Sequence, residues 1–127
     1  MVAVARTTAE RRRSEALGRF AETATVALYL CHGYWPLALR LRTPVGELDL
    51  IVRRGGTLVA VEVKLRVTAD DAATAITARN RRRIVDATRW WLALNPTHAR
   101  YTIRFDVVLW SPWSWPRRIA GAFEAER

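Results

Sequence analysis

Cysteine and long apolar runs are scarce in this sequence, and each scarcity excludes a class of protein. Cys31 is the only cysteine, so the chain can form neither an internal disulfide nor a cysteine-based zinc site. No run of about 18 consecutive apolar residues occurs, and the first 20 residues lack the apolar core of a signal peptide. We therefore expect no export and no membrane span, and a reducing cytoplasm as the location.

Negative charge is scarce as well. The 127 residues include 21 Lys+Arg and 12 Asp+Glu, which gives a formal net charge of +9. Such an excess favours a polyanionic partner such as nucleic acid, although ribosomal or membrane-surface binding stays open. The length and the half-apolar composition fit a single domain over residues 1–127, with residues 1–7 and 124–127 as flexible ends.

Apolar periodicity predicts two helices. The first is expected over about residues 8–32, where Gly33 can end it. The second is expected over about residues 72–94, where Asn95-Pro96 stops it. The predicted inner face of the first helix is Leu17, Phe20, Ala21, Ala24 and Leu28, and that of the second is Ile84, Ala87, Thr88, Trp91 and Leu92.

Four segments have the pattern of strands. "WPLALRLR" (35–42) is typical of an edge strand, and "GELDLIVRRGGTLVAVEVKLR" (46–66) of two strands joined by a tight turn. "YTIRFDVVLW" (101–110) follows the second helix, and a right-handed crossover makes it parallel to the strand before that helix. The tail after residue 110 is interrupted by prolines, and no element is assigned to it.

The hairpin carries charges that its fold does not need. If Gly55-Gly56 is a two-residue loop, Asp49 faces Glu62, Glu47 faces Lys64, and all four side chains share one face. The other face is aliphatic and is expected to pack against a helix. Its members are Leu48, Leu50, Val52, Val59, Val61 and Val63.

Opposed carboxylates require compensation. Two like charges directly across a sheet destabilise it. A hard cation such as Mg²⁺ or Mn²⁺ takes carboxylate oxygens and can be bridged to a phosphate. Lys64 would then orient or deprotonate a water molecule, or stabilise charge that develops on the phosphate.

The alternative is a solvated face on which Glu47 and Lys64 form a cross-strand ion pair. Two features favour the metal site. Apolar residues on the same face, such as Ile51 and Ala60, indicate a partly covered surface. Lys64 is also the only lysine in a chain with twenty arginines, which suggests that a compact ammonium is required at this position.

The hairpin resembles the motif of the YraN-like family, a bacterial family within the PD-(D/E)XK, or restriction-endonuclease-like, superfamily. The resemblance covers nearly the whole chain, because "GRFAETATVALYLCHGY" (18–34), "ITARNRRRIVDATRWWL" (76–92) and "RFDVV" (104–108) follow in the same order. It implies an α/β fold, a restriction-endonuclease-like mixed β-sheet flanked by helices in α-β-β-β-α-β order.

The resemblance also assigns roles to residues. Asp49 matches the metal-binding aspartate of the superfamily, and Glu62 and Lys64 match its E-x-K element; the three form the implied catalytic set. Glu22 matches a helix glutamate that archaeal Holliday-junction resolvases use as a further metal ligand, although an ordinary solvated glutamate remains open there. Glu47 matches the G-E-x-D pattern and would support the ligands. The nucleic-acid-binding candidates are Arg79, Arg81, Arg82, Arg83, Arg40 and Arg42.

Two positions depart from the family pattern. Asn80 stands where the family has a lysine, which puts one phosphate contact in doubt, and Ala21 stands where it has a glycine. Neither residue belongs to the predicted metal site.

Other chemistry-bearing residues have plainer interpretations. His32 and His98 are far apart in the sequence and are expected at the surface. Asp106 is expected to form a hydrogen bond or an ion pair with Arg104. The tryptophans are expected to pack, although Trp113 and Trp115, beside Arg117 and Arg118, could stack on unpaired bases.

Three function classes follow. The first is a nuclease that depends on Mg²⁺ or Mn²⁺ and hydrolyses phosphodiester bonds in nucleic acid, with branched or damaged DNA as candidate substrates. The second is a nucleic-acid-binding protein with a non-catalytic endonuclease-like site. The third, a structural adaptor, leaves the opposed carboxylates unexplained. The nuclease is the favoured interpretation, with DNA favoured over RNA and a homodimer left open.

Overall fold

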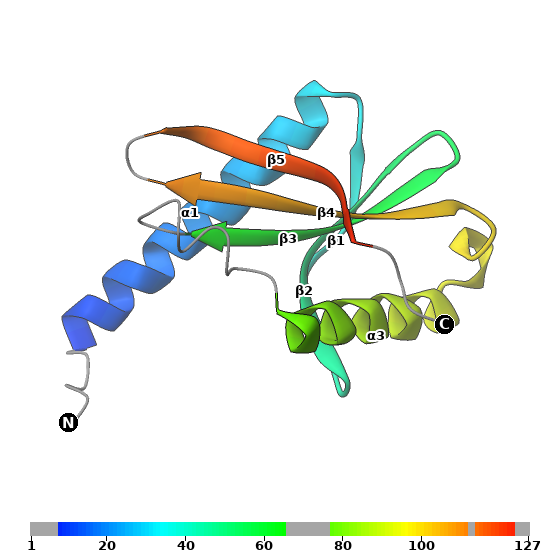
Figure 1. Ribbon diagram of the computed structural model, residues 1–127, viewed down its shortest axis with the longest axis horizontal. Coiled ribbons are helices and arrows are strands. Elements are labelled where there is room, and N and C mark those ends of the chain that lie inside the picture. Colours follow the sequence, from blue (N-terminus) through cyan, green and yellow to red (C-terminus); the bar gives the residue numbers. More distant parts are fainter. Residues whose placement is uncertain (1–7, 66–76, 112–113, 124–127) are drawn as a thin grey trace.

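The structure, a computed structural model, describes residues 8–65, 77–111 and 114–123. A five-stranded sheet lies between two long helices (Figure 1). In chain order the elements are α1 (Thr8–Cys31), β1 (Trp35–Thr43), β2 (Gly46–Arg54), β3 (Thr57–Leu65), α3 (Ala78–Leu94), a short 3-10 helix (Pro96–His98), β4 (Thr102–Ser111) and β5 (Ser114–Phe123).

The sheet is mixed, with strand order β1-β2-β3-β4-β5. β3 and β4 are parallel and joined through α3, and the other neighbours are antiparallel. This confirms the predicted α/β mixed sheet, the crossover and the edge position of β1.

β5 was not predicted. It pairs with β4 and forms the second edge of the sheet, so the element order has one strand more than expected. Pro116 interrupts the strand pattern in the sequence, but an edge strand tolerates a proline because one side of its backbone needs no ladder partner.

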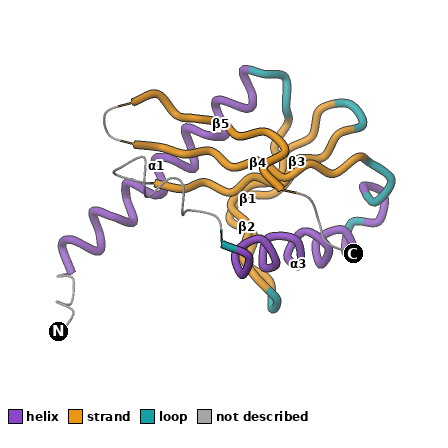
Figure 2. Tube along the Cα trace, in the orientation of Figure 1, coloured by secondary structure: helices purple, strands orange, loops and turns teal. Residues whose placement is uncertain are grey.

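The two helices cover opposite faces of the sheet, as the tube in Figure 2 also shows. The buried cluster on the α1 face contains Tyr29 and Tyr34 with Leu50, Val52, Val59, Val61 and Val108. The cluster on the α3 face contains Ile51, Leu58, Ala60, Phe105 and Val107 with Ile84, Ala87 and Trp91 of the helix. Neither helix of the described part combines the length and apolarity needed to cross a membrane.

The inner face of α1 differs from the prediction. Ala21, Thr25 and Tyr29 are buried at a spacing of four residues, whereas Leu17 and Phe20 are exposed. Thr25 is polar, but its buried hydroxyl has two hydrogen-bond partners. It donates to the Ala21 carbonyl at 2.6 Å and accepts from the Trp110 indole at 2.9 Å. A hydrophobic pattern cannot show such a threonine.

The helix ends follow local chemistry. Gly33 has φ +84° after α1, and the next amide, that of Tyr34, donates back to the Tyr29 carbonyl at 3.0 Å. α3 begins later than predicted: Thr77 is the N-cap, and its hydroxyl accepts the Asn80 amide at 3.1 Å. Residues 72–76, which the prediction included in the helix, lie outside the described residues, as do the predicted flexible ends 1–7 and 124–127.

Candidate active site

The hairpin pairing is regular only near its turn. Arg54 pairs with Thr57 across Gly55-Gly56, as predicted, and the ladder continues to Leu50 opposite Val61. There it ends, and β2 bends away from β3 (Figure 1). Asp49 and Glu62, which were predicted to face each other, lie just beyond the last paired position. The predicted Glu47–Lys64 pairing is wrong, because the strands have separated before they reach these residues.

β2 changes its face at Asp49. Leu48 packs in the cluster under α3, whereas Leu50 packs in the cluster under α1. In a regular strand, residues two apart point to the same face. The predicted uniform aliphatic face is therefore wrong at Leu48, and Asp49 lies at a discontinuity of the strand.

The neighbouring strand is irregular at the same level. Leu39 pairs with Leu50 and Leu41 with Leu48, so Arg40 lies beside Asp49. Arg40 has φ +49°, and no other non-glycine residue of the described part has a positive φ. A left-handed conformation costs an L-residue about 1–2 kcal/mol. Backbone strain of this kind often accompanies functional sites.

Asp49 is partly buried and poorly compensated. Its Oδ2 accepts the Val63 amide at 2.8 Å. Burial, together with the charges of Glu62 and Glu22, raises the pKa of this carboxyl to about 7, although the Val63 hydrogen bond and the charge of Lys64 lower it. The site therefore disfavours the ionised carboxylate unless a positive charge is added.

Glu62 and Lys64 form an ion pair on the α3 side of β3. Lys64 Nζ lies 2.9 Å from Glu62 Oε1, and the two side chains are 19% and 14% exposed. Both line a hollow of about 450 Å³, together with Glu47, Asn80 and Arg83. Lys64 thus pairs along its own strand, and the predicted cross-strand pair on a solvated face is not formed.

Glu22 lies on the side of α1 that faces the sheet. It shares a second hollow, of about 440 Å³, with Asp49, Arg40 and Glu47. Its Oε2 lies 2.5 Å from Arg40 Nε, and its side chain is 26% exposed. The structure thus brings Glu22 close to Asp49 but already pairs it with a cation. Glu47 is exposed and lines both hollows.

The predicted metal ligands are neighbours, but their carboxylate groups do not converge on one point. Among residues 8–65, 77–111 and 114–123, no group of three His, Cys, Asp or Glu side chains has the arrangement of a metal site. Glu62 and Glu22 are held by Lys64 and Arg40, respectively. The donors are nevertheless all carboxylate oxygens, which suit Mg²⁺ or Mn²⁺, and their charges raise the pKa of Asp49.

The arginines at the head of α3 do not all point to one place. All four, Arg79, Arg81, Arg82 and Arg83, are exposed. Arg83 lines the hollow that contains Lys64, whereas the Arg81 guanidinium lies 5.9 Å from the Phe123 ring, toward β5.

Gly46 helps to shape the site, a role that was not predicted. A Cβ at this position would lie 2.5 Å from the Arg83 carbonyl oxygen. The missing side chain lets the β1–β2 turn pack directly against the backbone of α3. The glycine of the G-E-x-D pattern was the available signal, because an unexplained glycine often marks such a close approach.

Residues expected to have structural roles mostly have them. Arg104 Nε donates to Asp106 Oδ1 at 2.8 Å, which confirms the expected pair. His32 is exposed, while His98 packs between Trp91 and Tyr101. Among the tryptophans, Trp115 is 91% exposed, so the expectation that it packs is wrong; Trp113 lies outside the described residues.

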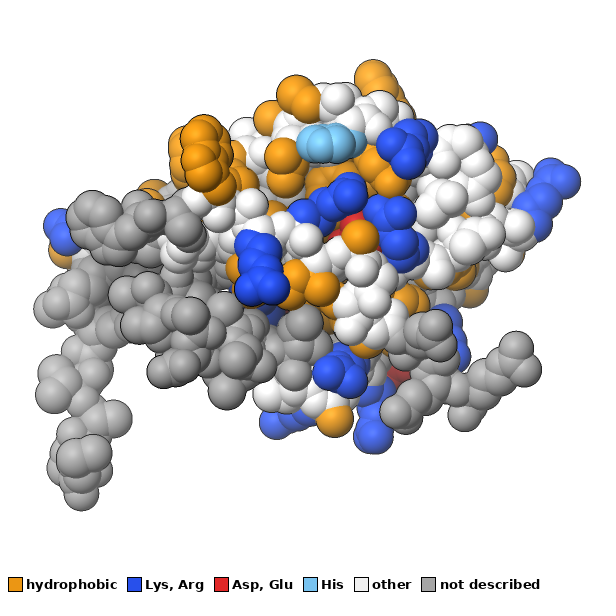
Figure 3. Space-filling view, turned by 45° about the horizontal axis from the view of Figure 1, so that its top comes forward, with side chains coloured by type: hydrophobic (Ala, Val, Ile, Leu, Met, Phe, Trp, Pro, Cys, Tyr) orange, Lys and Arg blue, Asp and Glu red, His pale blue; other side chains and the backbone are white. Residues whose placement is uncertain are grey.

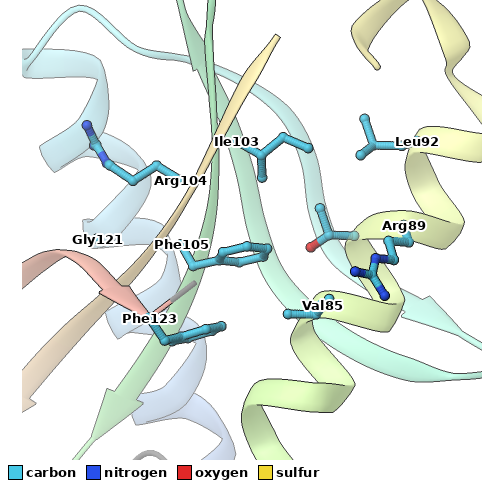
Figure 4. A pocket seen from close by; sticks show the side chains of 9 residues that line it. Val85, Arg89, Leu92, Ile103, Arg104, Phe105, Gly121 and Phe123 are labelled. Atoms are coloured by element: carbon cyan, nitrogen blue, oxygen red, sulfur yellow. The ribbon is translucent and has the colours of Figure 1, made fainter. Parts of the chain in front are cut away.

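A third hollow, of about 390 Å³, lies away from the predicted site residues. Figure 4 shows Phe105 and Phe123 next to each other on one side of it and Val85, Arg89 and Leu92 of α3 on the other. The two rings are stacked at 5.0 Å. None of the predicted catalytic or metal-binding residues lines this hollow.

Comparison with known proteins gives a family match and close relatives. The model of the uncharacterised protein family UPF0102 matches residues 21–110. A UPF0102 protein of Methylorubrum extorquens is 48% identical over 118 residues, which are 93% of this chain and 92% of the relative. The UPF0102 protein BRADO0179 of a Bradyrhizobium species is 47% identical over 116 residues, 91% of this chain and 82% of the relative.

Among solved structures, Hjc, a Holliday junction resolvase of Archaeoglobus fulgidus, is similar with a TM-score of 0.46 at 17% identity. The alignment covers 83% of this chain and 81% of Hjc.

Proposed function

The chain belongs to the uncharacterised protein family UPF0102, the YraN family that its motifs resemble, and on this premise we propose that it is a metal-dependent nuclease acting on DNA. One observation carries the proposal. Asp49 lies where β2 parts from β3 and changes face, beside the strained Arg40 and within the electrostatic reach of Glu62, Glu22 and Lys64. These residue types are the ones that phosphodiester hydrolysis with a divalent cation uses.

The metal would be held by carboxylate oxygens. Asp49 and Glu62 are the proposed ligands, and Glu22 is a further one. A divalent cation would remove the repulsion that raises the pKa of Asp49 and favour the ionised carboxylate. When bound, such an ion supplies Lewis-acid stabilisation of a phosphate oxygen and makes a nearby water more acidic.

Lys64 is proposed to act directly on the reacting phosphate or water. Its ammonium is mostly buried, is positioned by Glu62 at 2.9 Å and faces the hollow that Arg83 lines. It can donate three hydrogen bonds, and unlike arginine it can lose its proton. Glu47, at the rim of both hollows, would support the ligands.

The arginines are proposed to hold the nucleic-acid backbone. The formal charge of +9 favours a polyanion, and Arg83 lines the same hollow as Lys64. Arg79 and Arg82 are also exposed on this helix, and Arg42 lines the hollow beside Asp49. Contacts of this kind fix the position of a strand and carry no base information.

A second candidate is a nucleic-acid-binding protein without catalysis. It is favoured by the two ion pairs, because Lys64 and Arg40 already supply positive charge to Glu62 and Glu22. A site compensated in this way can persist without a metal ion.

A cleavage assay on gels separates the two candidates. Branched, single-stranded and duplex DNA are incubated with the protein in Mg²⁺, in Mn²⁺ and in chelator. The nuclease predicts cleavage only with metal, and none by Asp49→Asn or by the charge-conserving Lys64→Arg, each of which is first checked for folding. Binding without cleavage of every substrate supports the second candidate, and the absence of both binding and cleavage contradicts both.

A further inference from the structure

Three arginines from different strands surround two buried tyrosines at the far end of the α1 face. The guanidinium carbons of Arg54 and Arg104 lie 4.5 Å and 5.7 Å from the centroid of the Tyr34 ring, so both groups lie against this ring. The Arg118 guanidinium lies 5.9 Å from the Tyr29 ring, which contacts Tyr34 edge to face at 5.3 Å. We call Arg54, Arg104 and Arg118 the arginine cluster.

The arginine cluster carries more positive charge than its surroundings neutralise. Asp106 is its acidic partner and is held by Arg104 through two hydrogen bonds, at 2.8 Å and 2.9 Å. Arg54 and Arg118 are exposed, and neither forms an ion pair with another described residue. Figure 3 shows arginine and lysine side chains gathered around a small acidic spot on one face of the molecule.

The guanidinium groups are also held in place before any ligand arrives. Arg104 donates to the Tyr34 hydroxyl at 3.0 Å, and Arg54 donates to the His32 carbonyl at 3.0 Å, where it covers the negative end of α1. Stacking on an aromatic ring fixes the plane of a guanidinium. A preorganised cation loses less side-chain freedom when it binds an anion.

The cluster lies on the α1 face, as does the hollow that Glu22 and Asp49 share, whereas Glu62 and Lys64 lie on the α3 side. Two lengths of chain connect the cluster with the hollow of Glu22 and Asp49. Along α1, Glu22 and His32 are ten residues apart, which is about 15 Å at 1.5 Å per residue. Along β2, Asp49 and Arg54 are five residues apart, which is about 17 Å at 3.3 Å per residue. The two independent lengths agree on the separation.

We propose that the arginine cluster is a second phosphate-binding site for the nucleic acid whose scissile bond lies at Asp49. At 3.4 Å per nucleotide along a duplex strand, the separation corresponds to about four to five nucleotides. Guanidinium groups bind phosphate oxygens in pairs of hydrogen bonds and do not read bases. The cluster would anchor the backbone at a fixed distance from the cut; this inference rests on the proposed function.

The test measures binding against duplex length in metal-free buffer with chelator, so that no cleavage occurs. Arg54→Gln/Arg118→Gln is compared with Arg53→Gln/Arg100→Gln, which removes the same charge. Arg53 is the neighbour of Arg54 but lies over the Tyr101 ring, which packs on the α3 face, and Arg100 is exposed. The probes are blunt DNA duplexes from about 4 to about 16 base pairs, a range that brackets the expected span.

The expected result depends on length. On long duplexes, Arg54→Gln/Arg118→Gln should bind about tenfold more weakly than wild type, and its slope of log K against log salt should fall by about 1.8, or 0.9 per lost contact. On duplexes too short to reach the cluster, it should bind like wild type. The control variant should keep the wild-type length dependence. If Arg54→Gln lowers the melting temperature, Arg118→Gln alone is used, with an expected slope change of about 0.9.

Three outcomes overturn the proposal. A loss of affinity that is equal for short and long duplexes places the contact elsewhere. A loss of affinity equal to that of the control variant means that the cluster contributes only net charge. Normal binding by Arg54→Gln/Arg118→Gln shows that the cluster contacts no phosphate; the proposed function survives each of these results. If wild type binds no duplex of any length, this proposal is contradicted, and the proposed function is then decided by the branched and single-stranded substrates.

Discussion

Two aspartates of the sheet differ in the number of partners that the fold provides. Asp106 on β4 is 1% exposed, and its oxygens accept from Arg104, the Tyr29 hydroxyl at 2.7 Å and the Gly121 amide at 3.0 Å. Asp49 on β2 accepts the Val63 amide and faces the charges of Glu62 and Glu22. The first carboxylate is part of the folded framework, whereas the second is left under-compensated, as expected of a ligand-binding group.

The groups around Asp106 show the same difference. The carboxylate bonded to Arg104 raises the pKa of the guanidinium above its ordinary value, which keeps the guanidinium charged. The pKa of the Tyr29 hydroxyl is raised by burial and by its hydrogen bond to Asp106, so it remains a donor. The pKa values of Arg104 and Tyr29 are thus moved away from neutral pH, whereas that of Asp49 is moved toward it.

Removing the framework carboxylate should have the largest effect. Asp106→Asn leaves the Arg104 guanidinium without its counter-ion, and breaking one partner of a buried pair costs about 3–5 kcal/mol. Urea unfolding should show a loss of this size. Asp86→Asn, at a half-buried aspartate of α3, is the control and should lose far less. An Asp106→Asn protein as stable as wild type would mean that the network does not hold the sheet together.

A divalent metal ion should stabilise the protein by binding at Asp49. A saturating concentration of Mn²⁺ stabilises a protein that binds it in the folded state by about 2.7 kcal/mol at one hundred times Kd. We expect the melting temperature of wild type to rise with Mn²⁺ and Asp49→Asn to abolish most of the rise. Glu62→Gln should reduce it. An unchanged rise in Asp49→Asn would place the metal elsewhere.

Without metal, Asp49→Asn should stabilise the protein at neutral pH, in contrast to Asp106→Asn. The pKa of Asp49 is raised from 3.8 to about 7, so between these values the folded state binds more protons than the unfolded state. Stability from this group is therefore greatest below about pH 4 and is lost as the pH rises through 7. Since one pKa unit corresponds to about 1.4 kcal/mol, a gain of about 1–3 kcal/mol for Asn at pH 7.5 is expected.

Urea unfolding at two pH values checks this sign. The gain of Asp49→Asn over wild type should be present at pH 7.5 and should shrink at pH 4.5, where the wild-type carboxyl is protonated in the folded state. A variant that is less stable than wild type at pH 7.5 in chelator would show that Asp49 is adequately compensated by the Val63 amide.

The sequence predicts the framework better than the site, and the reason is local. Alternating aliphatic residues and the Gly55-Gly56 turn determine the pairing of β2 with β3 near the turn, and the crossover determines the parallel neighbour. β5 was missed because Pro116 breaks its pattern, and the inner face of α1 because Thr25 is polar yet satisfied within the helix. In both cases a residue finds hydrogen-bond or pairing partners that periodicity does not show. β5 pairs with β4, and Thr25 bonds to its own helix and to Trp110.

At the site, the residue types were predictable but their pairing was not. A period of two along both strands extends the ladder past Leu50 and Val61, and it therefore places Glu47 opposite Lys64. The strands separate next to two features that no periodicity shows, the packing of the β1–β2 turn against α3 at Gly46 and the left-handed Arg40. An arginine gives no sequence signal for that conformation, because its side chain does not favour it.

The strain at Arg40 makes the smallest and most specific prediction. In a regular strand, glycine is less stable than alanine by about 0.5–1 kcal/mol, because glycine loses more backbone freedom on folding. At φ +49° the order should reverse, since alanine keeps the cost of about 1–2 kcal/mol that glycine avoids. Both substitutions remove the ion pair with Glu22 equally, so the difference between them reports the backbone alone.

Arg42 provides the matched control on the same strand. It is exposed like Arg40, and its backbone has no positive φ. Urea unfolding should therefore show Arg40→Gly more stable than Arg40→Ala by up to about 1 kcal/mol, and Arg42→Gly less stable than Arg42→Ala. If alanine is the more stable residue at both positions, then β1 is unstrained beside Asp49, and the contrast with the relaxed surroundings of Asp106 is confined to hydrogen bonds and charge.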